Sequence, residues 1–148
     1  MSQQSIRFII HGRAQPAGSK RFVGVKGGKG IVIDANPHAK DWKLMVAEAA
    51  ARAREEAGWL LLRCPVSVSM IFYRPRPQSH YNKSGLRAAA PIYPATKPDR
   101  GKLARAVEDA LTGVIYLDDA QIVGGGISKR WADSEYVEIV IQRFDDNR

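Results

Sequence analysis

Three aspartates stand at the two ends of one short segment, where carboxylates could bind a metal ion. The segment KPDRGKLARAVEDALTGVIYLDDAQIV covers residues 97–123, with Asp99 near its start and Asp118 and Asp119 near its end. Carboxylate oxygens are hard ligands that suit Mg²⁺ or Mn²⁺. Such ions activate water and stabilise the leaving oxygen when a phosphodiester bond is hydrolysed. The residue types therefore indicate metal-dependent nuclease chemistry, or else a helix cap at Asp99 and a polar turn at the aspartate pair.

A helix followed by a strand would bring these distant acids together. Apolar residues at helical spacing predict a helix of about ten residues after Asp99. The predicted stripe consists of Leu103, Ala106, Val107, Ala110 and Leu111. Ten helical residues advance about 15 Å, and residues 114–117, predicted as a short strand, return about 13–16 Å. If Gly113 reverses the chain, the aspartate pair returns level with Asp99.

The rest of the chain predicts an α+β fold, in which one long and one short helix pack on a mixed β-sheet. Alternating apolar residues predict a main strand over 64–73. Apolar residues at helical spacing predict a helix over about 38–57, capped by Asn36-Pro37. Hairpins are predicted near both ends. The N-terminal strands are 5–10, 21–25 and 31–33, with the turn KGGKG, and the C-terminal pair is 122–131 and 136–144. A chain of 148 residues suits a single domain, 1–148.

The net charge favours a polyanionic partner. The chain has 23 Lys and Arg against 15 Asp and Glu, a formal charge of +8, which makes nucleic acid the leading candidate. Residues 74–98 contain five prolines and little periodicity, which predicts a long surface loop. The candidate contacts to DNA in this loop and beyond it are Arg74, Arg76, His80, Lys83, Lys97, Lys102, Lys129 and Arg130.

Other classes of protein are disfavoured. Cys64 is the single cysteine, so one chain can form neither an internal disulfide nor a thiolate-clustered zinc site. The scattered histidines show no spacing typical of zinc ligands or a nucleophilic triad. The N-terminus lacks the pattern of an export signal, and no apolar run approaches the roughly twenty residues that span a bilayer. We therefore expect a cytoplasmic location, in a bacterial cell or a phage-infected host.

The acidic segment resembles the RusA family of Holliday junction resolvases, which is common in phages and prophages. The resemblance rests on K-P-D, the helix L-x-x-A-V-x-D-A-L-T-G and the motif D-D-A-Q-I-V within residues 96–123. It extends to G-x-x-x-P at 12–16 and P-x-P-x-S-H at 75–80. It implies a homodimer that cuts branched DNA, such as a four-way junction, with Mg²⁺ or Mn²⁺.

The resemblance also implies roles for single residues. The family's metal ligands fall on Asp99, residue 101 and Asp119, with Asp118 beside the last. Arg105 falls where the family has a helical lysine, and its guanidinium could stabilise the pentacovalent phosphate or merely pair with Asp109.

Position 101 departs from the family pattern, because Gly101 has no side-chain oxygen. Three explanations remain open: a rearranged site in which Asp118 or water replaces the ligand, a homologue that binds junctions with weakened or absent nuclease activity, or an engineered inactive variant. Glu108 is expected to be solvated rather than a substitute ligand. A basic packaging or scaffold protein with accidental acidic turns is a further alternative.

Overall fold

The body of the protein is a five-stranded mixed sheet built around one long strand. The computed structural model describes residues 3–18, 20–34 and 37–145, without the side chains of 20–23 and 31–34. Strand β4 (Val66–Pro75) pairs antiparallel with β9 (Tyr136–Arg143), which in turn pairs antiparallel with β1 (Ser5–His11). On its other side β4 pairs in parallel with β7 (Ile122–Gly124) and then with β8 (Ile127–Ala132).

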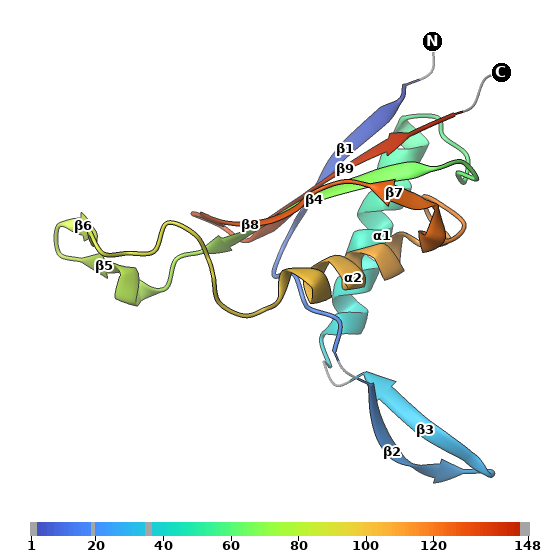
Figure 1. Ribbon diagram of the computed structural model, residues 1–148, viewed down its shortest axis with the longest axis horizontal. Helices are drawn as coiled ribbons and strands as arrows, with labels where there is room; N and C mark the ends of the chain where they lie inside the picture. Colours follow the sequence, from blue (N-terminus) through green and yellow to red (C-terminus); the bar gives the residue numbers. More distant parts are fainter. Residues whose placement is uncertain (1–2, 19, 35–36, 146–148) are drawn as a thin grey trace.

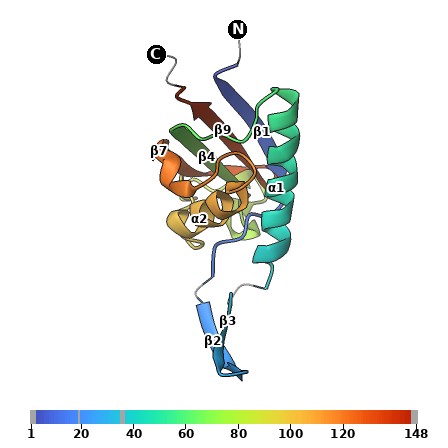
Figure 2. The same cartoon turned by 90° about the vertical axis from the view of Figure 1, so that its right-hand side faces the viewer.

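Both predicted helices are present and lie on the same face of this sheet (Figures 1 and 2). Helix α1 (Ala39–Glu56) and helix α2 (Arg100–Leu111) also pack against each other. The whole predicted stripe of α2 is buried. Helix α1 begins at Ala39, with His38 at the N-cap position but without a side-chain capping hydrogen bond. The predicted cap residue, Asn36, lies outside the described residues.

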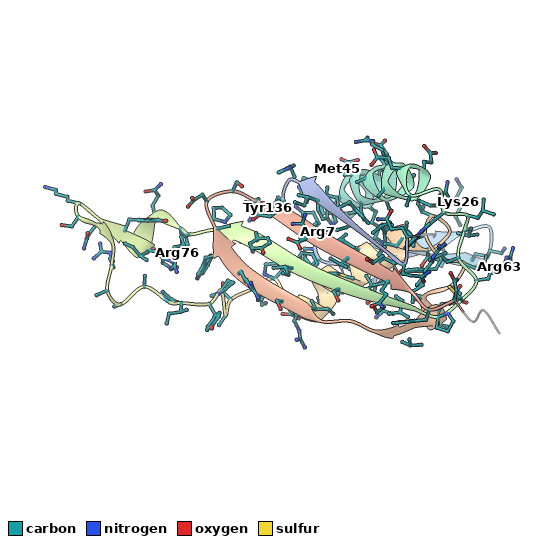
Figure 3. The ribbon with its side chains drawn as sticks, turned by 90° about the horizontal axis from the view of Figure 1, so that it is seen from above. Arg7, Lys26, Met45, Arg63, Arg76 and Tyr136 are labelled. Atoms are coloured by element: carbon teal, nitrogen blue, oxygen red, sulfur yellow. The ribbon has the colours of Figure 1, made fainter. Side chains whose placement is uncertain are left out.

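The alternation along the strands separates the core from an open sheet face. The inward side chains of β4, namely Val66, Val68, Met70 and Phe72, are almost fully buried, as are Val137, Ile139 and Ile141 of β9. The opposite face carries Arg7 and Tyr136, which Figure 3 shows on the side away from the helices. There Arg7 forms a two-bond ion pair with Glu138, with N–O distances of 2.9 and 3.0 Å.

The predicted α+β class with a mixed sheet is confirmed, but the C-terminal strands do not form a hairpin. Strands β8 and β9 both pair with β4, which lies between them. The connection at 133–135 therefore crosses the end of β4. Local alternation predicts each strand but not its neighbour, since pairing depends on residues far away in the chain.

The chain crosses closely over β4 at Gly125, between β7 and β8. This glycine has φ +120°, and a Cβ placed on it would lie 2.0 Å from the carbonyl oxygen of Val68. Only glycine fits a contact this close without moving the backbone of β4.

Two hairpins project from the body in different directions (Figure 1). The N-terminal hairpin is confirmed: β2 (Lys20–Lys26) pairs with β3 (Lys29–Asp34) through the glycine turn at 27–28. The second hairpin lies within residues 74–98, which are largely irregular as predicted but are not wholly structureless. It contains the 3₁₀ turn η1 (Gln78–His80) and strands β5 (Tyr81–Asn82) and β6 (Gly85–Leu86).

Side-chain hydrogen bonds explain why this second hairpin, which we call the arm (residues 76–95), is ordered. Asn82 Oδ1 accepts a hydrogen bond from the N–H of Ser84 at 2.9 Å, and Gly85 follows with a φ of +115°. Arg87 Nε donates to the carbonyl oxygen of Ser79 at 3.0 Å. Asparagine and glycine are frequent in tight turns, so the motif N-K-S-G carried this signal.

The strand predicted over 114–117 is wrong. After α2 the chain makes a tight turn, in which the carbonyl oxygen of Leu111 accepts from the N–H groups of Val114 and Ile115 at 3.0 and 2.9 Å. Tyr116 then forms an isolated bridge to Leu62. The apolar residues 115 and 116 are buried in the core, which explains their strand-like composition. Among the described residues, no helix is long and apolar enough to cross a membrane.

Candidate active site and nucleic-acid interface

A pocket with a volume of about 710 Å³ opens at the N-terminal end of α2, and we call it the basic pocket. It is lined by Arg13, Ala14, Gln15, Pro16, His38, Arg74, Lys97, Pro98, Asp99 and Lys102. Four of these side chains are cationic, and Asp99 is the one carboxylate in the lining. The pocket therefore combines an anion-attracting wall with a single acid.

Asp99 lines this pocket, and its carboxylate does not cap the helix. Asp99 occupies the N-cap position of α2, and its carbonyl oxygen accepts from the N–H of Leu103 at 3.0 Å. Its side chain, however, makes no capping hydrogen bond. The interpretation of Asp99 as a simple helix cap therefore does not explain its carboxylate.

Hydrogen bonds between distant segments hold the walls of the basic pocket. Lys129 Nζ donates to the carbonyl oxygens of Thr96 and Pro98, at 2.7 and 3.0 Å. The N–H of Ala17 donates to the carbonyl oxygen of Lys102 at 2.9 Å. Lys129, predicted as a DNA contact, thus holds the chain immediately before Asp99.

Positive charge is concentrated where the end of β4 meets the segment after β1. Burial lowers the pKa of Arg74, Glu135 opposes this effect, and the neighbouring charge of Arg13 adds to it. Arginine nevertheless remains protonated at physiological pH. Two guanidinium groups so arranged would be stabilised by a bound anion such as a phosphate.

The aspartate pair lies in a turn that is held by side-chain hydrogen bonds. Asp118 Oδ1 accepts from the N–H of Ala120 at 2.9 Å, and Gln121 Oε1 accepts from the N–H of Asp118 at 2.9 Å. Gln121 Nε2 also donates to the carbonyl oxygens of Leu62 and Cys64. Asp118 Oδ1 therefore caps this turn, as the interpretation of the aspartate pair as a polar turn predicts.

Asp119 is exposed, and its charge acts on the second half of α2. The pKa of Glu108 is raised by burial first, then by the charges of Asp119 and Asp109, while Arg105 partly opposes these effects. Glu108 is half-buried rather than solvated as expected from the sequence. Asp109 Oδ2 lies 3.5 Å from Lys43 Nζ and so forms an ion pair with α1.

The predicted metal ligands fit a divalent ion only if the protein supplies few of the ligands of that ion. In the ranges 3–18, 20–34 and 37–145, no three His, Cys, Asp or Glu side chains are grouped so that they could hold a metal ion. Mg²⁺ is commonly held by one or two carboxylates together with substrate phosphate oxygens and water. Asp99 suits that mode, and the assignment of Asp118 and Asp119 as ligands stays a prediction.

The other predicted contacts fall into two groups. Arg74, Lys97 and Lys102 line the basic pocket. Arg76, His80 and Arg130 lie around Trp131, where the arm meets β8. Lys83 is exposed at the tip of the arm, and Arg105 is exposed on α2.

Sequence reasoning missed several residues that build these sites. Arg13 and His38 line the basic pocket, although neither was a candidate. Arg13 lies inside the G-x-x-x-P motif, which was a usable signal. Gln121 lies inside D-D-A-Q and could have been suspected as the side chain that holds the turn. Trp131 had no signal beyond its place in a strand.

Two comparisons with known proteins bear on this site. The family model described as Endodeoxyribonuclease RusA matches residues 13–142. The match contains all lining residues of the basic pocket and the whole acidic segment. The chain is also 32% identical over 140 residues to the "Uncharacterized protein YqaN" of Bacillus subtilis (strain 168), covering 93% of this chain and 95% of that protein.

Proposed function

Because the chain belongs to the RusA endodeoxyribonuclease family, we propose that it binds branched DNA, including four-way junctions, and hydrolyses phosphodiester bonds in it. One observation carries this proposal. The carboxylate of Asp99 makes no capping hydrogen bond and lines a pocket whose other charged groups are cationic.

The residues of the basic pocket would hold the phosphodiester group. Arg13, Arg74, Lys97 and Lys102 can donate charge-assisted hydrogen bonds to phosphate oxygens, which position the backbone without reading its sequence. Arg105 lies one helical turn after Lys102, on the exposed side of α2. It would stabilise the charge that grows on the pentacovalent phosphate.

A divalent cation, Mg²⁺ or Mn²⁺, would supply an activated water and stabilise the leaving oxygen. Asp99 would hold it, with Asp119 and Asp118 as further proposed ligands. The phosphodiester oxygens gathered by the four cations would complete the donor set, which explains why few protein carboxylates suffice.

The protein would act as a homodimer. A four-way junction contains two equivalent strands to be cut, and a two-fold dimer presents one site to each of them.

A second candidate function is junction binding with weakened or absent cleavage. It is favoured by Gly101, which provides no carboxylate, and by the lack of a three-acid group among the described residues. A Cβ at position 101 would meet no heavy atom within 4 Å beyond the adjoining backbone of its own helix, so position 101 has space for a side chain.

Cleavage of an end-labelled four-way junction in Mg²⁺ or Mn²⁺ tests both functions. The natural chain should cut, and Asp99→Asn should bind the junction without cutting it. Binding without cutting by the natural chain, with cutting restored by Gly101→Asp, would establish the second function. A chain that neither binds junctions in preference to duplex nor cuts them in either form would refute both.

A further inference from the structure

A second pocket, with a volume of about 310 Å³, lies where the arm meets the end of β8, and we call it the aromatic pocket. Its lining includes Arg76, Tyr81, Tyr93, Arg130, Trp131 and Asp133. None of these residues lines the basic pocket. Figure 3 shows Arg76 at the arm, at the opposite end of the molecule from Arg63.

The inner wall of this pocket is held in place by the protein. The guanidinium carbon of Arg76 lies 5.4 Å from the ring centroid of Trp131, and Arg76 Nη1 donates to the carbonyl oxygen of Pro91 at 2.7 Å. The ring of His80 meets Trp131 edge-on, with 5.2 Å between centroids. Arg76 and His80 therefore fix the orientation of the indole.

The outer wall, in contrast, is exposed aromatic surface. Tyr93 is 69% exposed and Tyr81 is 40% exposed. These two rings are therefore accessible to a ligand in the pocket. Arg130 adds a positive charge, and Asp133 adds an acceptor that suits an amino group.

We propose that the aromatic pocket takes up one unpaired nucleobase of the branched DNA. This inference rests on the proposed function, because it assumes that branched DNA is the ligand. The rings of Tyr81, Tyr93 and Trp131 line a small pocket and offer stacking faces to a planar heterocycle, and every base has such a face. The volume is near the lower end of the range for small-molecule sites, roughly 300–1,000 Å³.

A duplex would not use these rings in the same way. Bases inside a duplex present their edges to a protein, so a ring reaches the face of a base only where the stack has been opened. Bases at a branch point or a bulge are easier to extrude, because part of their stacking and pairing is already lost. The pocket would thereby give the protein a preference for DNA that contains an unpaired base.

Binding to matched DNA bulges tests this inference. Three labelled duplexes are compared in the presence of a metal chelator: one with a single extra 2-aminopurine nucleotide, one with an abasic nucleotide in its place, and one fully paired. We expect the natural chain to bind the base-containing bulge roughly 5- to 150-fold more tightly than the abasic bulge, as stacking of one base provides about that factor. The fluorescence of 2-aminopurine should fall on binding.

Three variants separate stacking from general affinity. Tyr93→Ala should remove the preference and the fluorescence change while leaving affinity for the abasic bulge unaltered, whereas Tyr93→Phe should keep both. Leu86→Ala is the matched control, because Leu86 is 53% exposed on the same arm but does not line the pocket. Circular dichroism melts establish that each variant is folded.

Two results would overturn the inference: equal affinity of the natural chain for base-containing and abasic bulges, or an equal loss of affinity for both bulges in Tyr93→Ala. If the natural chain cuts four-way junctions but treats the two bulges alike, the inference fails and the proposed function stands. If it binds no branched DNA at all, both fail.

Discussion

The hydroxyl of Tyr116 donates a hydrogen bond of 2.8 Å to the main-chain carbonyl oxygen of Glu108. The Tyr116 side chain is fully buried, and burial raises the pKa of the phenol well above its usual range, so the hydroxyl keeps its proton. This contact joins the turn after α2 to the helix itself. Together with the main-chain hydrogen bonds of the turn, it holds the start of the segment with Asp118 and Asp119.

Removing this hydroxyl should cost little stability. The carbonyl oxygen of Glu108 also accepts from Thr112 Oγ1 and from the Thr112 N–H, at 2.9 and 3.1 Å, so it is not left unsatisfied. We expect Tyr116→Phe to lower the free energy of unfolding by about 1 kcal/mol, as measured by urea denaturation. Tyr93→Phe, on an exposed ring, should leave it unchanged. A loss of 3 kcal/mol or more would mean that the contact does more than close the turn.

Lysines of the basic pocket should contribute to binding through phosphate contacts. Lys102→Ala should weaken binding to four-way junctions and duplex alike. It should also reduce the slope of log affinity against log salt concentration by about 1. The measurement is fluorescence anisotropy over a series of salt concentrations. Unchanged slopes would exclude Lys102 from contact with DNA.

Lys129 should behave differently from Lys102. Since Lys129 Nζ holds two carbonyl oxygens next to Asp99, Lys129→Ala should reduce the rate of cleavage more than it reduces affinity. Single-turnover cleavage at saturating protein, compared with anisotropy, separates these effects. If Lys129→Ala lowers the slope of log affinity against log salt concentration by about 1 but leaves the single-turnover cleavage rate unchanged, Lys129 is a phosphate contact and not a positioning residue.

The crossing at Gly125 should tolerate no side chain. Gly125→Ala places a Cβ 2.0 Å from the carbonyl oxygen of Val68 at a φ that other residues rarely adopt, so we expect a loss of about 2–4 kcal/mol in the free energy of unfolding. Gly126→Ala is the matched control, because a Cβ there meets no atom within 4 Å. Similar urea midpoints for the two variants would contradict the close contact.

The ion pair on the open sheet face should appear in the acid titration. The hydrogen bond from Arg7 lowers the pKa of Glu138 below its usual value of 4.5. A lowered pKa in the folded state gives a contribution to stability that is present above pH 4.5 and is lost as the pH falls through the folded value. NMR titration should show the low pKa in the natural chain and a return towards 4.5 in Arg7→Ala. Arg63→Ala, at an exposed arginine elsewhere, should leave it low.

Local periodicity predicted the elements whose burial depends on a repeating pattern. The stripe of α2, the alternation of β4 and the inward residues of β9 were all visible in the sequence, because helices and strands expose and bury residues with a fixed period. The family was recognised from the motifs around Asp99 and Asp118, and the match over residues 13–142 confirms it.

Features that depend on long-range pairing were not predictable in this way. The placement of β4 between β8 and β9 follows from contacts between segments about 60 residues apart. Residues 114–117 have the composition of a strand because they are buried, although they form a turn. The walls of the basic pocket come from four separate segments, and only the motif at 12–16 connected Arg13 with Asp99.

The first and last strands of the fold are neighbours, with Ser5 opposite Gln142 and His11 opposite Tyr136. Figure 1 shows β1 and β9 side by side. During synthesis, β1 has no strand of this sheet to pair with until β9 has also left the ribosome. The nascent chain therefore exposes the unpaired edge of β1 until β9 has been made. The same adjacency makes the chain a suitable subject for circular permutation, with new ends at the tip of either hairpin.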